Sequence, residues 1–265
     1  MKEHSLRAIF ALVLLLSSVT LPLACGSSTE TPGSPDSGSI SLGDSGYIDS
    51  PDPDADKGVV DGGFLGPDGS ILPKHRFAAK VESFTPGTCA GFGSTAMPDI
   101  VLGPPVGAGD LKGSLDVVSL GVGGEIVLSF DDNVIVDGPG VDFIVFENAF
   151  YAGGNEDQPV VDLAEVSVSE DGTTFTPFPC APPAAPPYDA CAGWHPVYSA
   201  PNNGISPLDP AKAGGDGFDL STIGVAKARF VKIKDKASDP CNVTPKPDNA
   251  GFDLDAIAVV NGEKP

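Results

Sequence analysis

Short apolar runs separated by turn residues occupy this 265-residue chain from Lys74 to Pro265, and this pattern constrains the fold more than any other feature. No stretch of a dozen residues there keeps the helical spacing of apolar side chains. Strand-like runs occur at 124–130, 141–147, 164–169, 173–178, 228–234 and 252–260. The pattern predicts an all-β domain over residues 74–265, an antiparallel β-sandwich of jelly-roll (galactose-binding-like) type.

Two of these runs carry more detail. The run 141–147 is apolar at consecutive positions, which is typical of a central strand with both faces buried. In the last run, the apolar side chains change parity between Leu254 and Ile257. A slip of one residue near Asp255 predicts a β-bulge at that point.

The first 24 residues have the form of a signal peptide. Lys2 and Arg7 stand before or early in an apolar run that ends in Leu21-Pro-Leu-Ala-Cys25. Cys25 after Leu-Ala resembles the lipobox of bacterial lipoproteins, which implies cleavage before Cys25 and lipidation of its thiol. Gly26 in place of aspartate implies sorting to the outer membrane. The competing interpretation is an ordinary signal peptide in which Cys25 is a bystander.

The chain is strongly acidic. Its formal net charge of −21 repels phosphate backbones and argues against nucleic acid as a partner. Residues 25–73 are rich in Ser, Gly, Pro and Asp, so we expect a disordered, self-repelling linker behind the lipidated cysteine. Carboxylate oxygens are the ligands that Ca²⁺ prefers, and a structural Ca²⁺ is therefore the cofactor that the sequence favours.

Four cysteines follow the lipidation site. An even number in an exported domain predicts disulfides. Cys180 and Cys191 bracket a proline-rich loop and are expected to bond to each other, which leaves Cys89 to pair with Cys241. A zinc site is the competing interpretation, but no pair of cysteines has the Cys-x-x-Cys spacing.

A near-repeat singles out candidate metal ligands. Gly214–Ser221 and Asn249–Asp255 both contain Gly-Phe-Asp-Leu beside a strand-like run. The aspartates of the second copy share the polar parity of a strand that is otherwise core, and a buried carboxylate needs a cation or hydrogen-bond donors. The candidate Ca²⁺ ligands are Asp253, Asp255, Asp219, Asp216, Asp142 and Glu147. The alternative is that these carboxylates accept backbone N–H bonds at turns.

Aromatic residues gather in one loop. The candidate ligand-binding residues there are Tyr188, Trp194, His195 and Tyr198. Flat rings on a disulfide-pinned loop could stack on sugar rings, because each ring offers an apolar face and a polar tip. The alternative is that the loop simply packs onto the sandwich.

A set of short motifs spans Phe77 to Asn261. They are Gly123–Phe130, Val136–Asn148, Ala164–Ser169, Cys191–Gly193, Pro196–Tyr198, Gly214–Leu220 and Gly251–Ile257. In this order they resemble an uncharacterised family of bacterial, myxobacterial-type cell-surface lipoproteins that has no assigned reaction. More distantly, the closing strand with its aspartate pair is similar to the last strand of jelly-roll carbohydrate-binding and discoidin-like modules. That second resemblance implies a structural Ca²⁺ near this strand.

These features together predict a lipid-anchored binding module rather than an enzyme, on the outer membrane or cell surface of a diderm bacterium. Motifs of serine hydrolases, zinc proteases and phosphate-binding loops are absent from the sequence. The expected partners are the membrane, through the N-terminal lipid, and a glycan or another envelope component. The alternatives are a polysaccharide hydrolase that uses two of the clustered carboxylates, and a purely structural or adhesive surface protein.

Overall fold

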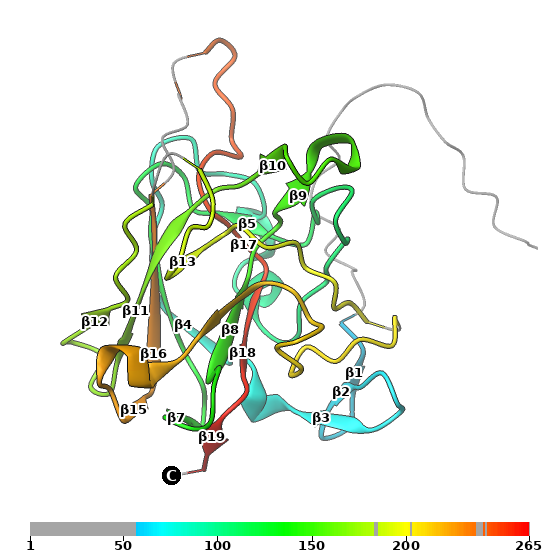
Figure 1. Ribbon diagram of the computed structural model, residues 1–265, viewed down its shortest axis with the longest axis vertical. Helices are drawn as coiled ribbons and strands as arrows, with labels where there is room; N and C mark the ends of the chain where they lie inside the picture. Colours follow the sequence, from blue (N-terminus) through cyan, green and yellow to red (C-terminus); the bar gives the residue numbers. More distant parts are fainter. Residues whose placement is uncertain (1–56, 183–184, 202, 237–240, 242, 265) are drawn as a thin grey trace, which may run out of the picture. The chain divides into compact units, whose positions relative to one another are not determined.

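The computed structural model describes residues 57–264 except 183–184, 202, 237–240 and 242 (Figure 1). The chain divides into two units, Met1–Gly46 and Tyr47–Pro265, and all of the described residues belong to the second. The predicted signal peptide, the lipidation site at Cys25 and most of the predicted linker lie outside the described residues.

The described residues form strands and short 3₁₀ helices. The strands are β1 (Val59–Val60), β2 (Gly63–Leu65), β3 (Ile71–Pro73), β4 (Lys80–Thr85), β5 (Val118–Ser119), β6 (Glu125–Ser129), β7 (Val134–Val136), β8 (Phe143–Phe146), β9 (Phe150–Tyr151), β10 (Pro159–Val160), β11 (Ala164–Ser169), β12 (Thr176–Pro177), β13 (Cys191–Ala192), β14 (Asp216–Phe218), β15 (Lys227–Ala228), β16 (Phe230–Asp235), β17 (Asp253–Leu254), β18 (Ala256–Val259) and β19 (Gly262–Glu263). The 3₁₀ helices are η1 (Lys74–Arg76), η2 (Ser94–Ala96), η3 (Asp99–Val101), η4 (Ala152–Gly154) and η5 (Leu220–Ile223). The predicted β character of the domain is confirmed. Among these residues, no helix is both long enough and apolar enough to span a bilayer.

Two antiparallel sheets contribute to one hydrophobic core. The larger has six strands in the order β12-β11-β16-β6-β4, with β13 also paired to β11, and the smaller has the order β14-β8-β18 (Figure 1). Buried side chains from both sheets meet in this core, among them Leu128, Val231, Val145 and Ile257. The alternation in the sequence supplies these side chains, because successive residues of a strand face opposite sides of the sheet.

Strand β8 is buried on both faces, as its sequence predicts. Phe143 and Val145 belong to the main core. Ile144 and Phe146 alternate with them and lie in a second cluster that includes Phe77. Strands β14 and β18 pair with the two edges of β8, so β8 is enclosed. The residue that follows β8 is therefore buried as well.

The end of the chain changes sheet at Asp255 and does not form the predicted β-bulge. Strand β17 pairs with β5, whereas β18 pairs with β8. Between them, the N–H of Asp255 donates to the carbonyl oxygen of Phe146 at 3.0 Å. The change of parity in the sequence therefore marks the point where the strand exchanges one neighbour for another.

The folded part begins before Lys74, the residue at which the sequence predicts that the domain starts. Strands β1, β2 and β3 form an antiparallel sheet between Val59 and Pro73. The ring of Phe64 in β2 packs edge-on against Phe77, with ring centroids 5.3 Å apart. The last part of the predicted linker is thus structured, because its few apolar side chains find partners in the domain.

One of the two predicted disulfides is formed. Cys180 and Cys191 are bonded, with their Cα atoms 4.6 Å apart. The predicted bond between Cys89 and Cys241 is not formed. The Sγ of Cys241 donates instead to the carbonyl oxygen of Thr88 at 3.3 Å, so it is directed at the backbone next to Cys89. The disulfide indicates an extracytoplasmic protein, because such bonds persist in oxidising compartments.

Candidate metal centre

Glu147 is the first residue after β8, and its carboxylate is buried. The residue is 1% exposed, and neither Oε1 nor Oε2 has a hydrogen-bond partner among the described residues. Burial raises the pKa of Glu147 well above its usual range, and the charges of Asp253 and Asp162 raise it further. The N–H of Asn148 lowers this pKa in part but lies outside good hydrogen-bond geometry. A buried carboxylate without donors is costly, so this position needs a proton or a cation.

Asp162 and Asp253 join Glu147 in a group that we call the Glu147 cluster. One oxygen from each of the three carboxylates lies within 4.8 Å of the others. Asp253 begins β17, and Asp162 lies between β10 and β11. The Asn148 Nδ2 donates to Oδ2 of Asp253 at 3.2 Å, and the hydroxyl of Ser119 donates to Oδ1. These donors fix the orientation of Asp253 beside the carboxylate of Glu147.

A pocket of about 340 Å³ adjoins this cluster, and we call it the β9–β10 pocket. It is lined by Asn148, Phe150, Val160, Asp162, Pro247, Asn249, Ala250 and Asp253. Two of the three residues of the cluster, Asp162 and Asp253, therefore line the pocket, whereas Glu147 is buried and does not. Strands β9, β10 and β17 bring these residues to the same end of the molecule (Figure 1).

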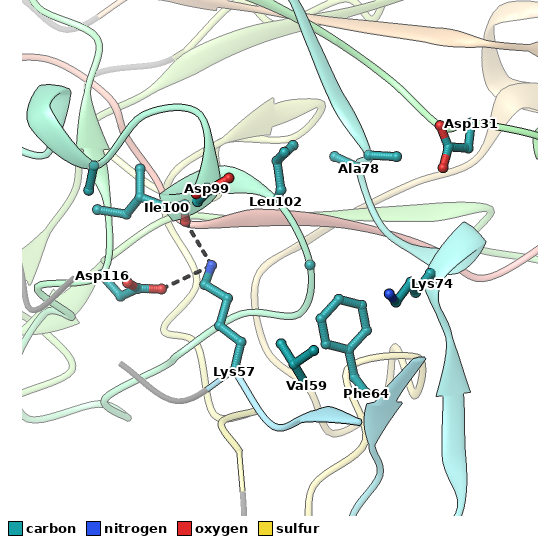
Figure 2. Close-up of a pocket in the computed structure, with 13 residues that line it drawn as sticks. Lys57, Val59, Phe64, Lys74, Ala78, Asp99, Ile100, Leu102, Asp116 and Asp131 are labelled. Carbon is teal, nitrogen blue, oxygen red and sulfur yellow. Dashed lines mark hydrogen bonds and ion pairs between the residues drawn. The ribbon is translucent and has the colours of Figure 1, made fainter. Parts of the chain in front are cut away.

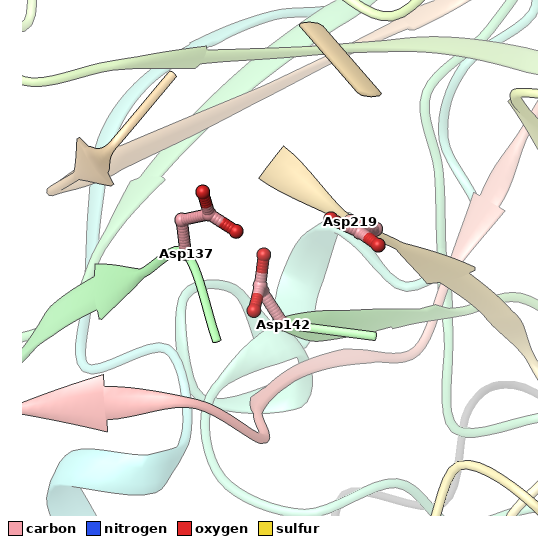
Figure 3. A group of neighbouring side chains, drawn as sticks. All are labelled: Asp137, Asp142 and Asp219. Atoms are coloured by element: carbon pink, nitrogen blue, oxygen red, sulfur yellow. The ribbon is translucent and has the colours of Figure 1, made fainter. Parts of the chain in front are cut away.

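A second group of carboxylates consists of Asp137, Asp142 and Asp219, whose side chains converge in Figure 3. The fully buried Asp142 is saturated by donors: its Oδ1 accepts from Asn261 Nδ2 at 2.8 Å, and its Oδ2 accepts from the Leu220 N–H at 2.8 Å. Asp219 caps the start of η5. The carboxylates of Asp142 and Asp219 organise the backbone, which matches the alternative that the sequence left open for them.

Asp216, another predicted ligand, holds a loop instead. Its Oδ2 accepts the N–H groups of Gly193 and Trp194 at 2.6 and 3.2 Å. Its Oδ1 lies 2.7 Å from Nδ1 of His195. Burial raises the pKa of Asp216, whereas the interaction with His195 and these N–H groups lower it.

Asp255 is fully buried and interacts electrostatically with Lys57 and Asp116, two residues that line a larger pocket of about 600 Å³. Figure 2 shows this pocket. There, Lys57 Nζ lies 3.0 Å from Oδ2 of Asp116 and donates to the carbonyl oxygen of Ile100 at 2.7 Å. Both carboxylate oxygens of Asp255 accept from the N–H of Val106, at 3.2 and 3.0 Å. Burial raises the pKa of Asp255 to about 8; Lys57 lowers it and Asp116 raises it. Asp255 thus belongs to a different charge network from Asp253.

The six predicted ligands therefore separate. Only Glu147 and Asp253 meet in the Glu147 cluster, and the sequence missed their third partner, Asp162. Asp162 lies outside both copies of Gly-Phe-Asp-Leu. No local pattern marks it, because its role follows from the approach of two distant segments.

Three of the four predicted aromatic-site residues meet. The rings of Tyr188 and Trp194 are perpendicular, with centroids 5.9 Å apart, and the centroids of Trp194 and His195 are 3.6 Å apart. Tyr198 interacts with other residues. Burial raises the pKa of its hydroxyl, and Tyr151 and nearby acidic residues raise it further.

Gly193 connects this aromatic loop to the Glu147 cluster. Its φ is +95°, and a Cβ at this position would lie 2.0 Å from the carbonyl oxygen of Asp162. Only glycine allows such a close approach. The loop that carries Trp194 therefore lies directly against the backbone that presents Asp162.

The sequence matches no protein-family model and no curated protein. Among solved structures, the chain is similar to the C-terminal domain of a chitobiase from Bacteroides fragilis, with 14% identity and a TM-score of 0.31. The match covers 73% of this chain and 98% of that one. So distant a likeness assigns neither a family nor an activity.

Proposed function

We propose that the chain is a non-catalytic, calcium-stabilised binding module whose Ca²⁺ is held by Glu147, Asp162 and Asp253, and that it binds a glycan or another envelope component. The observation that carries the calcium site is the Glu147 carboxylate, which is buried, lacks hydrogen-bond donors among the described residues and adjoins two more carboxylates. Three carboxylates this close repel one another. A divalent cation converts that repulsion into attraction.

The chemistry of the donor set favours calcium. The cluster offers carboxylate oxygens, without the sulfur or imidazole ligands that zinc prefers. Ca²⁺ accepts six to eight oxygens in irregular arrangements, whereas Mg²⁺ demands a near-ideal octahedron. Carboxylates from three separate segments, one of them able to bind through both oxygens, suit the more tolerant ion.

A hydrolase is the second candidate, and the pair of His195 and Asp216 favours it. A buried carboxylate beside Nδ1 orients the imidazole, as in general-base sites. The carboxylates of the Glu147 cluster suit hydrolysis less well, because Glu147 is too deeply buried to reach a glycosidic oxygen. Incubation with a panel of polysaccharides separates the candidates: a hydrolase shortens a chain, and shortening that His195→Ala abolishes would replace the binding proposal.

We also propose a jelly-roll sandwich and a lipid anchor at Cys25 for the mature protein. The shared core of the two larger sheets supports the sandwich. The Cys180–Cys191 disulfide supports export, and the anchor rests on the lipobox-like sequence.

Thermal unfolding with and without CaCl₂ tests the metal site. A ligand at a hundredfold excess over its Kd stabilises a protein by about 2.7 kcal/mol. For a chain of this size that raises the melting temperature by about 5–10 °C. We expect this shift in the wild type, its reversal by EDTA and its loss in Glu147→Gln, which keeps the shape of the side chain and removes its charge.

Asp219→Asn is the matched control, because it changes a carboxylate of the second group and should leave the shift intact. The proposal fails if Ca²⁺ does not raise the melting temperature of the wild type, or if Glu147→Gln responds as the wild type does.

A further inference from the structure

We infer that the cation of the Glu147 cluster directly binds adjacent hydroxyl groups of a neutral sugar in the β9–β10 pocket. This inference rests on the calcium site proposed above and names the ligand class of that site. It also selects this pocket over the aromatic loop as the place where the ligand binds.

The number of protein ligands leaves room for such a ligand. If Glu147 binds through both oxygens and Asp162 and Asp253 through one each, the cluster supplies four oxygens. Ca²⁺ takes about six to eight, so two to four positions fall to water or to a ligand. Asp162 and Asp253 line the pocket, whereas Glu147 is buried and does not, so we place these open positions on the side of the pocket.

The size and lining of the pocket fit one sugar ring. Its volume of about 340 Å³ is near the small end of the ~300–1,000 Å³ typical of ligand sites. Phe150 and Val160 give it an apolar wall against which the C–H face of a sugar can pack. Asn249 adds an amide that can hydrogen-bond to hydroxyls, and Asn148 adds an acceptor, its Oδ1, because its Nδ2 already donates to Asp253 and Ser114.

Charge selects a neutral ligand. Three carboxylates and one Ca²⁺ leave the cluster with a net charge of −1. None of the described residues that line the pocket is basic, and the chain as a whole carries −21. A uronate would therefore approach an already negative site, whereas uncharged vicinal hydroxyls can replace two waters on the cation without adding charge.

The test measures binding of methyl glycosides of mannose, galactose, glucose and fucose to the full chain by calorimetry and ligand-observed NMR. The methyl glycosides of glucuronate and galacturonate serve as anionic counterparts. We expect at least one neutral glycoside to bind in CaCl₂, with affinity at least about tenfold lower in EDTA, and to bind more tightly than either uronate. Phe150→Ala and Asn249→Ala should weaken this binding and keep the calcium-induced rise in melting temperature, whereas Trp194→Ala should keep both.

The outcomes separate the two proposals. If Ca²⁺ raises the melting temperature but no neutral glycoside binds, or a uronate binds more tightly, the ligand assignment is overturned and the calcium site stands. Binding that persists in EDTA also overturns it. Binding that Trp194→Ala abolishes while Phe150→Ala does not overturns it as well, and places the sugar on the aromatic loop. If Ca²⁺ itself has no effect, both proposals fall.

Discussion

Replacing Asp142 tests whether a buried carboxylate of this fold holds backbone or binds a cation. Asp142 is fully buried. Its carboxylate accepts hydrogen bonds from the Gly138 N–H at 2.9 Å, from Asn261 Nδ2 at 2.8 Å and from the Leu220 N–H at 2.8 Å. Asp142→Asn keeps the shape of the side chain but puts an amide NH₂ in place of Oδ2, opposite the Leu220 N–H.

The magnitude follows from these three bonds. A hydrogen bond to an ionised group contributes about 1.5–3 kcal/mol. In Asp142→Asn the amide oxygen retains the two bonds of Oδ1 in a weaker, neutral form, while the bond from Leu220 is lost and its N–H stays buried. We expect the free energy of unfolding to fall by about 3 kcal/mol in Asp142→Asn, and by about 5 kcal/mol or more in Asp142→Ala, which loses all three acceptor contacts.

Urea unfolding followed by the fluorescence of Trp194, the only tryptophan in the sequence, measures both changes. Because Asp142 is bound by protein donors, the loss should be the same in EDTA and in CaCl₂. Asp219→Asn is the control and should stay within about 0.5 kcal/mol of the wild type, since asparagine also caps a helix start. A loss below about 0.5 kcal/mol in Asp142→Asn, or a loss seen only with Ca²⁺, would refute this reasoning.

The disulfide, a buried carboxyl and a tight glycine support three more measurements. The Cys180–Cys191 bond closes a loop of 11 residues, and the loss of chain entropy in the unfolded state then stabilises the fold by about 3 kcal/mol. The variant with both cysteines replaced by serine should therefore melt about 6–10 °C lower than the wild type. An unchanged melting temperature contradicts this. Asp255 has its pKa raised to about 8 in the folded state, against 3.8 as the reference value. Its contribution to stability is therefore complete below pH 4 and is lost as pH rises toward 8, by about 1.4 kcal/mol per pH unit. In urea unfolding in EDTA at pH 5 and pH 7, the fall in stability should be smaller by about this amount per pH unit in Asp255→Asn than in the wild type, since the raised pKa of Glu147 contributes to the fall in both. Gly193→Ala places a Cβ 2.0 Å from the carbonyl oxygen of Asp162, so it should destabilise the fold by about 2 kcal/mol and weaken Ca²⁺ binding. If calorimetry shows that the variant binds Ca²⁺ with wild-type affinity, the link between the loop that carries Trp194 and the Glu147 cluster is contradicted.

Local alternation was enough to predict several of the strands, among them β6, β8, β11 and β16, and their buried faces. The run 164–169 matches β11, and the run 141–147 contains β8, buried on both faces as its consecutive apolar residues indicated. The disulfide across the loop between Cys180 and Cys191 was equally accessible, because it closes a short segment. These features depend on neighbours in the sequence, so a single sequence carries the information for them.

Pairing between distant segments was not predictable in this way. The change of parity near Asp255 was visible, but only the structure shows β17 pairing with β5 and β18 with β8. The small sheet between Val59 and Pro73 was read as linker, since its strands are short and its composition is polar. The sheet packs against the domain through the contact between Phe64 and Phe77, and no local sequence pattern predicts that contact.

The candidate metal site was likewise predictable only in part. From its parity in a core strand, the sequence by itself indicated that Asp253 would be buried and would need a partner, and it named Glu147 among the possible companions. Only the tertiary structure brought Asp162 to these two and surrounded Asp142 and Asp216 with N–H donors. The physical reason is that a buried carboxylate is stabilised by whichever donors or charges surround it. Those groups come from segments far apart in the chain, so composition and spacing can nominate the acids but cannot decide which of them bind a cation.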